Sequence, residues 1–453
     1  MPARLIESLA TTDALAELFS DHSMLRAMLD FEVALARAEA RVGVIPRAAV
    51  EPIAAAARAS DFDAAALARA AFVAGTPTIP VVKALTEKVG SRDPAAAGYV
   101  HWGATSQDVA DTALVLLLKR AEAILTNDLS RLEAALRHLS EKHKDTVMLG
   151  RTLMQAAPPV TFGLKAAGWL GAVSRGAQRL NAAFADALVL QFGGASGTLA
   201  SLGDHGAAVA AALAEELGLS NPEAPWHSQR DGLATLVCAC GVVTASRGKM
   251  AQDIVLLMQN EVAEAAEPSS EGRGGSSTMP HKHNPTACIL TLAAATRVPG
   301  LVASFLSAMV QEHERAAGGW QAEWPIVVSV MQATGTAIAS MAETAEGLSV
   351  DAERMRANVT GTKGSVFAER AMMVLGAKLG RDVAHRILEE ASRRSFAEDR
   401  HLADVLAGMP EVTSHIDAST LRGLEKPEEY LGSAEKFRQA LLSSSQPSQK
   451  KEG

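Results

Sequence analysis

The feature that most constrains the fold is a long stretch, from residue 104 to residue 149, that contains neither glycine nor proline. Apolar residues recur within it at spacings of three and four, which is the spacing of one face of an α-helix. They are Leu114, Leu118, Ala121, Leu125, Leu129, Leu132, Leu136 and Leu139. Because thirty helical residues extend about 45 Å, the stretch predicts one long rod, or two nearly continuous ones, of the kind found in helix bundles.

Other segments predict further helices. One begins at a Ser23 cap and ends at Gly43, with apolar residues alternating four and three apart between them. Three longer helices are predicted at residues 226–267, 286–316 and 325–348. Pro299 should kink the second of these, because proline removes a helical hydrogen bond. No alternating strand pattern is evident in the sequence, so the chain is expected to be nearly all α.

Changes in composition divide the chain into three parts. Residues 1–110 mix alanine-rich and proline-rich segments, residues 111–350 hold the long helices, and residues 351–453 contain shorter, charged segments. We expect an N-terminal helical domain, a central bundle that carries oligomerisation and the active-site clusters, and a C-terminal helical domain. The polar tail after Leu442 is expected to be disordered, because it has too little apolar surface to bury.

Composition argues against several classes of protein. The chain has 453 residues, of which 48% are hydrophobic, and a formal net charge of -8. Without a positive field, a nucleic-acid or membrane surface is not expected, and an anionic ligand must be held by local donors. The three cysteines are too few for a disulfide framework, and the N-terminus lacks the apolar core of a signal peptide. We therefore expect a soluble protein of the cytoplasm.

A polar segment, GSSTMPHKHNP at residues 275–285, lies between two predicted helices, which is a usual place for a catalytic loop. A hydroxyl such as that of Ser276 or Ser277 can act as a base only where positive charge and backbone donors stabilise its alkoxide. Lys282 and the N-terminus of a helix that begins near Asn284 are placed in the sequence to supply that stabilisation.

Another polar cluster, VHWGATSQD at residues 100–108, directly precedes the long helix. It places His101, Thr105 and Ser106 beside the unpaired N–H groups and the positive dipole end of that helix, which suit a substrate carboxylate. The alternative is that Ser106 or Asp108 only caps the helix. The gathering of several polar side chains beside a glycine favours the functional interpretation.

Two further clusters are GRTLMQ at residues 150–155 and FGGASGTL at residues 192–199. Arg151 could grip a carboxylate with two hydrogen bonds, with Thr152 and Gln155 as neutral donors, or it could form only a surface salt bridge. The glycines of the second cluster allow backbone N–H groups to approach an anion, or two helices to pack closely.

The loop at residues 275–285 fits the G-S-x-x-M-x-x-K-x-N signature of the fumarase/aspartase superfamily. The matching residues are Gly275, Ser276, Met279, Lys282 and Asn284. The four clusters follow the family's order, so the resemblance covers about residues 20–350. It implies a long central helix bundle flanked by two smaller helical domains, and a homotetramer whose active sites are shared between subunits. No metal site or nucleotide-binding loop is evident in the sequence, so no cofactor is expected.

Two positions indicate which reaction the resemblance implies. Lyases of the purine pathway carry a histidine at the position of Leu153 and a glutamate at that of Ile289. Leucine cannot transfer a proton, and isoleucine cannot orient a histidine. We therefore expect a cycloisomerase, an intramolecular lyase that closes a lactone ring on a muconate tricarboxylate. The alternatives are an adenylosuccinate-type lyase, a cycloisomerase of a related muconate such as a sulfo-muconate, and a crystallin-like structural protein.

The resemblance also implies roles for residues of the four clusters. Ser276 resembles the family's serine base and is the first candidate to deliver a proton, and Lys282 is its rival or the electrostatic partner of a carboxylate. The residues expected to bind the substrate are His101, Thr105, Ser106, Arg151, Thr152, Gln155, Ser277, Met279 and Asn284. The roles of His281 and His283 stay open. Three tryptophans either wall the site or simply pack, namely Trp102, Trp320 and Trp324.

Overall fold

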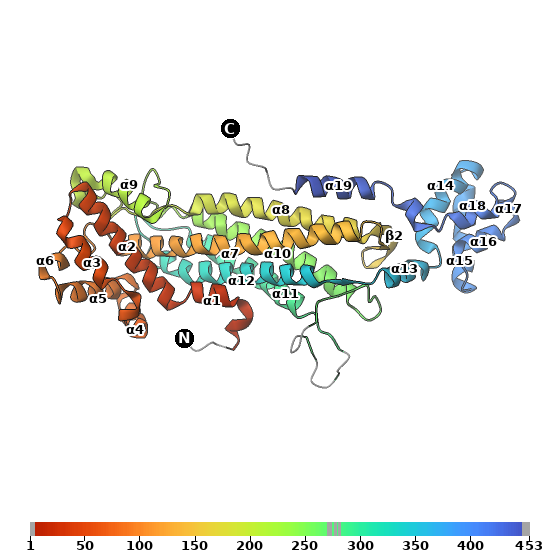
Figure 1. Ribbon diagram of the computed structural model, residues 1–453. Coiled ribbons are helices and arrows are strands. Elements are labelled where there is room, and N and C mark those ends of the chain that lie inside the picture. The colour runs from red at the N-terminus through yellow and green to blue at the C-terminus, as the bar shows by residue number, and fades with distance from the viewer. Residues whose placement is uncertain (1–4, 270–273, 276–278, 280–281, 446–453) are drawn as a thin grey trace. The chain divides into compact units, whose positions relative to one another are not determined.

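The computed structural model describes residues 5–269, 274–275, 279 and 282–445 (Figure 1). Helices dominate the described chain and its strands are short, so the all-α expectation is confirmed. By its internal contacts the chain forms two compact units. Unit 1 comprises Met1–Ser130, Gly176–Gly248 and Leu290–Ser340, and unit 2 comprises Arg131–Arg175, Lys249–Ile289 and Met341–Gly453. The three-part division near residues 110 and 350 stays a prediction.

Five long helices contribute residues to both units. They are α7 (Ser106–Lys142), α8 (Phe162–Ala187), α10 (Asp231–Leu257), α11 (Thr286–Ala308) and α12 (Gly319–Gly347). Helix α7 is continuous over 37 residues, and the leucines and the alanine of its repeat are all buried. The predicted rod is therefore one helix rather than two, because its apolar face is covered along the whole length.

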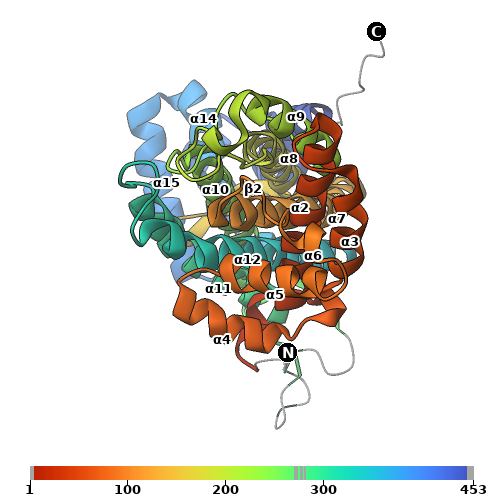
Figure 2. The same ribbon diagram turned by 90° about the vertical axis from the view of Figure 1, so that its left-hand side faces the viewer.

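The rest of unit 1 consists of shorter helices joined by brief 3₁₀ turns. They are α1 (Asp13–Leu18), α2 (Asp21–Val42), α3 (Val50–Ala56), α4 (Ala64–Ala74), α5 (Thr78–Gly90), α6 (Pro94–Ala97) and α9 (Gly206–Leu217). Helices α2, α3, α5 and α6 pack together, as Figure 2 shows, and α2 also packs along α9.

Helix α2 begins earlier than predicted. Its N-cap is Ser20, whose hydroxyl accepts a hydrogen bond from the backbone N–H of Ser23. Ser23 therefore lies inside the first turn, and its expected role as the cap is wrong. The end of the helix is as predicted, because Gly43 adopts the left-handed conformation, with φ of 92°, that closes many helices.

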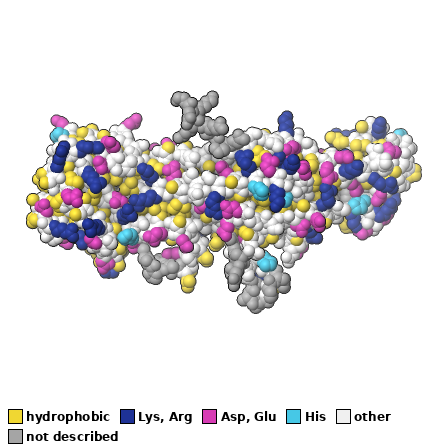
Figure 3. Space-filling view, viewed as in Figure 1, with side chains coloured by type: hydrophobic (Ala, Val, Ile, Leu, Met, Phe, Trp, Pro, Cys, Tyr) yellow, Lys and Arg dark blue, Asp and Glu magenta, His cyan; other side chains and the backbone are white. Residues whose placement is uncertain are grey.

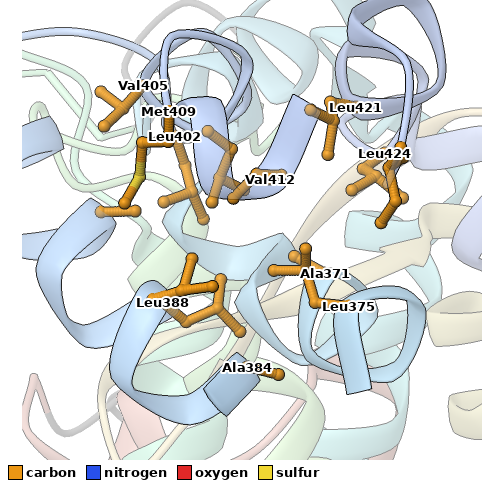
Figure 4. Close-up of a cluster of buried hydrophobic side chains, with 14 residues drawn as sticks. Ala371, Leu375, Ala384, Leu388, Leu402, Val405, Met409, Val412, Leu421 and Leu424 are labelled. Atoms are coloured by element: carbon orange, nitrogen blue, oxygen red, sulfur yellow. The ribbon is translucent and has the colours of Figure 1, made fainter. Parts of the chain in front are cut away.

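Unit 2 contains two small antiparallel pairings and a set of shorter helices. The pairings are β1 (Val147–Thr152) with β2 (Gln155–Thr161), and β3 (Ala265–Ala266) with β4 (Ser349–Val350). The helices are α13 (Ala352–Thr360), α14 (Ala368–Leu379), α15 (Arg381–Ala397), α16 (Leu402–Ala407), α17 (Pro410–Thr413), α18 (Ala418–Gly423) and α19 (Ala434–Ser444). Helices α14 to α18 enclose a hydrophobic core that includes Leu375, Leu388 and Val412 (Figure 4).

Neither helix α8 nor the hairpin of β1 and β2 was predicted from the sequence. The two-residue turn of the hairpin is Leu153–Met154, and both residues have positive φ, 49° and 66°. Turns of this kind usually carry Asn-Gly, because a side chain in the left-handed region costs about 1–2 kcal/mol per residue. Without that signal the hairpin could not be recognised from residue types. Leu153 is 97% exposed, so packing within the chain does not offset its strain.

The long helices near the loop differ from prediction at their ends. Helix α11 ends before residue 316, and α12 begins before Pro325. Both helices continue through a proline, Pro299 in α11 and Pro325 in α12. Helix α19 reaches Ser444 and so takes up the start of the predicted tail, whereas the tail from residue 446 lies outside the described residues.

Helices α11 and α12 have the length and apolarity of membrane-spanning helices. The apolar window of α12 is 61% buried within the chain, whereas that of α11 is 22% buried. Core helices of soluble proteins have the same composition, so this is weak evidence for a membrane.

Basic and acidic side chains are interspersed over the face seen in Figure 3. An apolar helix left open in one chain is typical of a surface that an assembly covers.

Glu39 is an unusual residue of α2, because it is fully buried. In the described part of the chain, neither of its carboxyl oxygens has a hydrogen-bond partner. Burial raises the pKa of Glu39 from 4.5 to about 9, and the nearby charge of Glu32 adds to the shift. The carboxyl group is therefore protonated at neutral pH.

We predict that Glu39 makes the protein less stable as the pH rises. A carboxyl whose pKa is raised by folding contributes its full stability below pH 4.5 and loses it progressively up to about pH 9. At about 1.4 kcal/mol per pH unit, the loss between about pH 5.5 and about pH 8 is about 3 kcal/mol. Glu39→Gln removes this titration. Between about pH 5.5 and about pH 8, the free energy of unfolding measured in urea should therefore fall by about 3 kcal/mol less in the variant than in wild type. Equal pH dependence in both proteins would contradict the assignment.

Candidate active site

The first cluster, in unit 1, is organised by the carboxylate of Asp108, which is fully buried in the first turn of α7. Its Oδ1 accepts hydrogen bonds from the N–H of Gly193 at 2.9 Å and from Nε2 of His227 at 2.7 Å. Its Oδ2 accepts from the N–H groups of Thr105 at 3.0 Å and Gly194 at 2.9 Å. One carboxylate therefore joins the start of α7 to the glycine-rich cluster.

The bond from the N–H of Thr105 to Asp108 is one half of a capping box. Asp108 therefore does cap α7, as the alternative interpretation of the sequence held. Thr105 and Ser106 are half-buried at the start of the helix, where backbone N–H groups lack helical partners. Both residues thus remain candidates for binding a carboxylate, because the capping function is met by Asp108.

A second group of buried charges adjoins α7 one turn further on. Arg230 is 1% exposed and donates to Asp111 at 2.7 and 3.1 Å, and to Glu323 at 2.7 and 2.9 Å. Trp320 donates its Nε1–H to Asp111 at 2.9 Å. Burial raises the pKa of Glu323, and the charge of Arg230 only partly opposes that shift. Two buried carboxyl groups thus share one guanidinium.

Gln107 connects these two groups. Its Nε2 donates to Asp111 at 3.1 Å and to the carbonyl oxygen of His227 at 2.8 Å. Its Oε1 accepts from Nε of Arg315 at 3.1 Å, and Arg315 also donates to the carbonyl oxygen of Ala195 at 3.1 Å. The side chain of Gln107 is therefore occupied by the protein itself and serves to position the helix start.

Sequence reasoning missed most of this network. The residues that it did not single out are Asp111, His227, Arg230, Arg315 and Glu323. One signal was available, since Gln107, Asp108 and Asp111 share one side of a helix that is otherwise apolar there. Buried polar groups need partners, so this spacing indicates a network. The partners themselves lie far along the chain and carry no local pattern.

His101 lies just before α7 in the left-handed conformation, with φ of 61°, and its Nδ1 is 2.7 Å from Oε1 of Glu32. Glu32, on α2, is 2% exposed, so the histidine is held from inside the protein. The neighbouring Trp102 is 43% exposed and stays open to a ligand. Trp320 is 3% exposed and packs edge-on against Trp324, so its role is packing and hydrogen bonding.

In unit 2, Arg151 grips a carboxylate with two hydrogen bonds, but that carboxylate belongs to the protein. Nη1 and Nη2 donate to Glu264 at 2.9 and 2.7 Å, and Asn358 donates to the same carboxylate at 2.7 Å. Glu264 is fully buried and the Arg151 side chain is 30% exposed, so the pair is a partly buried ion pair rather than the fully exposed one that was the alternative. The pair fixes β1, while Thr152 and Gln155, on either side of the turn, are exposed.

The signature loop is described only in part. Ser276, Ser277 and His281 lie outside the described residues. The carbonyl oxygen of Gly274 accepts hydrogen bonds from the backbone N–H and from Nδ2 of Asn284, at 2.9 and 3.0 Å. A Cβ on Gly274 would lie 2.6 Å from the carbonyl oxygen of Asn284. Asn284 therefore bonds back to the residue that precedes the signature segment. The helix expected near Asn284 begins at Thr286.

Met279 and Lys282 line a cavity of about 530 Å³ beside the end of α10. Gln259 and Asn260 contribute amide side chains to the same cavity, and His283 lies on its wall. Cavities of this size hold small organic molecules. Asn284 also lines the cavity, so the structure brings three of the predicted site residues together. Among the residues that it describes, no three His, Cys, Asp or Glu side chains are grouped so as to hold a metal ion.

The helical architecture is shared with a family of lyases. The chain matches the lyase family over residues 7–300 and the adenylosuccinate lyase C-terminus family over residues 364–441. It therefore belongs to the lyase family, and it is an enzyme of the fumarase/aspartase superfamily.

Relatives within the family point to a narrower group. The chain is 48% identical to the 3-carboxy-cis,cis-muconate cycloisomerase of Bradyrhizobium diazoefficiens, over 97% of this chain and 98% of that protein. It is 44% identical to the nitrosuccinate lyase of Streptomyces davaonensis, over 92% of this chain and 89% of that protein. The crystal structure of the 3-carboxy-cis,cis-muconate lactonizing enzyme from Pseudomonas putida superimposes with a TM-score of 0.93 at 46% identity, covering 98% and 99% of the two chains.

We predict that Asp108→Asn destabilises the protein by about 2–4 kcal/mol, because an amide nitrogen would face donors that now meet a carboxylate oxygen. Asp63→Asn is a matched control. The side chain of Asp63 caps α4 at the surface by accepting from the N–H of Ala66, and asparagine is an equally good cap. Urea denaturation measures both variants. Similarly small changes in both would argue against the organising role of Asp108.

Proposed function

We propose that the chain is a cycloisomerase that converts 3-carboxy-cis,cis-muconate to 4-carboxymuconolactone, in the β-ketoadipate route of protocatechuate and aromatic degradation. The observation that carries this proposal is the 48% identity to such an enzyme over 97% of the chain. Leu153 supports it, because that position holds no group that can transfer a proton.

The proposed reaction is an isomerisation that forms a ring. An oxygen of one substrate carboxylate adds to a carbon of a double bond, and the π electrons move to the next carbon, beside another carboxylate. The resulting enediolate is then protonated at that carbon. The ionised tricarboxylate thus takes up one proton and becomes a lactone with two carboxylates, while the fully protonated forms of substrate and product are isomers. Catalysis needs positive charge aimed at the enediolate and a group that delivers the proton. We assign the proton to Ser276 and the charge to Lys282, with Lys282 as the rival donor.

Recognition of the substrate's three carboxylates is proposed to use the polar clusters. Thr105 and Ser106 offer hydroxyls at the N-terminal, positive end of α7, although the N–H of Thr105 is already bonded to Asp108. Thr152 and Gln155 are exposed on the hairpin that the Arg151–Glu264 pair holds in place. Because Arg151 is already paired, its contribution is to position these neighbours. Ser277, Met279 and Asn284 are retained as proposed contacts on the loop. No cofactor enters the proposal.

We also propose that the enzyme is a cytoplasmic homotetramer with shared active sites. Support comes from α11 and from Val310, just after its end. Large apolar side chains there are open to solvent in the single chain. Ile289 is 50% exposed, Leu306 is 44% exposed and Val310 is 85% exposed. Large apolar side chains left exposed in a single chain are often covered by another subunit.

A lyase that eliminates a small group is the second candidate. It is favoured by the 44% identity to a nitrosuccinate lyase. An elimination from a dicarboxylate passes through the same kind of enediolate, so the same loop could serve either reaction. Only the substrate distinguishes the two.

An absorbance assay tests the proposed function. Purified protein should remove the ultraviolet absorbance of 3-carboxy-cis,cis-muconate, because lactonisation breaks the conjugated diene. The same preparation should leave adenylosuccinate and nitrosuccinate unchanged. Cleavage of either succinate together with an unchanged muconate would show that the chain is a lyase instead.

A loop variant tests the assignment of the proton donor. Ser276→Ala should lower kcat on the muconate by about 100-fold to 10,000-fold, the usual contribution of a proton-transfer group. The urea midpoint should stay the same, since the loss is one hydroxyl. If Ser276→Ala retains normal turnover while Lys282→Met abolishes it, the proton comes from Lys282.

A further inference from the structure

The contact between His101 and Glu32 is short, and its carboxylate is buried, unlike that of a surface ion pair. Nδ1 of His101 is 2.7 Å from Oε1 of Glu32, and the carboxylate is 2% exposed on the buried side of α2. Because carboxylate oxygens only accept, Nδ1–H is the donor. The contact also ties down a residue in the left-handed conformation, which costs free energy for a side chain that is not glycine.

This contact determines which ring nitrogen can meet a ligand. Nδ1 is committed to Glu32, so Nε2 is the nitrogen at the partly open edge of the ring. The side chain of His101 is 19% exposed. Within the described residues no hydrogen bond to Nε2 is found. A histidine whose one nitrogen is fixed by a carboxylate presents the other in a defined direction.

The charges that face His101 come from two helices. Burial lowers the pKa of His101, but the charge and hydrogen bond of Glu32, together with the charge of Asp108, outweigh burial and raise the pKa above 6.5. Asp108, on α7, is already occupied by four donors. Glu32, on α2, is therefore the direct partner of the imidazole, and its second oxygen has no hydrogen-bond partner among the described residues.

We propose that Glu32 is a positioning residue that holds His101 as an imidazolium, with Nε2–H directed to a carboxylate of the substrate. The cation adds to the hydroxyl donors of Thr105 and Ser106, which follow it by four and five residues in the sequence. A fixed cation suits a tricarboxylate in a protein whose net charge is -8. This inference rests on the proposed function for the identity of the substrate, but not for the state of the histidine.

Glu39 provides a matched control on the same helix. It lies seven residues, or about two turns, after Glu32 and is equally buried, yet it bonds to no histidine among the described residues. Glu32→Gln and Glu39→Gln therefore make the same substitution at two buried positions of one helix, but Glu39 is already neutral at pH 7. Only Glu32→Gln removes the charge beside His101.

The first experiment follows the histidine itself and needs no turnover. In NMR titrations of histidine-labelled protein, His101→Gln identifies the His101 signal. Wild type should show a His101 pKa above 6.5. Glu32→Gln should lower that pKa by about one unit or more, Glu39→Gln should leave it unchanged, and Glu32→Asp should restore part of the shift. A His101 pKa that does not move in Glu32→Gln would overturn the proposal.

The second experiment measures carboxylate binding by calorimetry. The probe is propane-1,2,3-tricarboxylate, which has no double bond to react. Near pH 7, Glu32→Gln should weaken its binding about fivefold or more, equivalent to about 1 kcal/mol, and Glu39→Gln should not. If the His101 pKa falls in Glu32→Gln but the affinity does not, Glu32 is only structural and the proposal is wrong. If Glu32→Gln changes both the His101 pKa and the tricarboxylate affinity as expected, but the protein does not turn over the muconate, only the proposed reaction is refuted and the role of Glu32 stands.

Discussion

Four hydrogen bonds to one buried carboxylate, that of Asp108, hold the best-defined part of the site together. A carboxylate only accepts, so every partner must present a donor, and three of the four are backbone N–H groups. Two of these belong to Gly193 and Gly194. A Cβ on Gly193 would lie 2.6 Å from Pro225, and Gly194 has φ of 68°, so glycine is needed at both positions. The glycine-rich cluster is therefore explained by its approach to Asp108.

The neighbouring charges of Arg230, Asp111 and Glu323 also fix the position of α7, but their burial costs more free energy. Taking an ion pair out of water costs several kcal/mol, and well-packed apolar residues often do as well or better for stability. What the charges provide is direction, since a guanidinium donates its hydrogen bonds to carboxylates in the plane of its N–H groups. They tie α7 to α12 and to the residue before α10 at one geometry, and Thr105 and Ser106 are carried on that frame.

Unit 2 shows the same use of a buried carboxylate. Glu264 holds Arg151 and Asn358, and with them the hairpin whose turn, Leu153–Met154, is strained and exposed. A strained backbone persists only where the surrounding structure fixes it. The sequence predicted that Arg151 could grip a substrate carboxylate with two hydrogen bonds, with a surface salt bridge as the alternative. It could not show that the carboxylate is Glu264, because the pair is separated by more than a hundred residues.

The sequence by itself determined four of the five long helices, the all-α class and the signature loop, because apolar spacing, glycine and proline act on the chain locally. Helix α8 was not predicted. The predicted start of α2 was wrong by three residues, since the cap is Ser20 and not Ser23. Only the tertiary structure decided which polar side chains pair. Asp108 meets His227, and His101 meets Glu32, from positions far apart in the chain. Such partners carry no shared local pattern, and they are chosen only when the helices pack and burial makes an unpaired charge too costly.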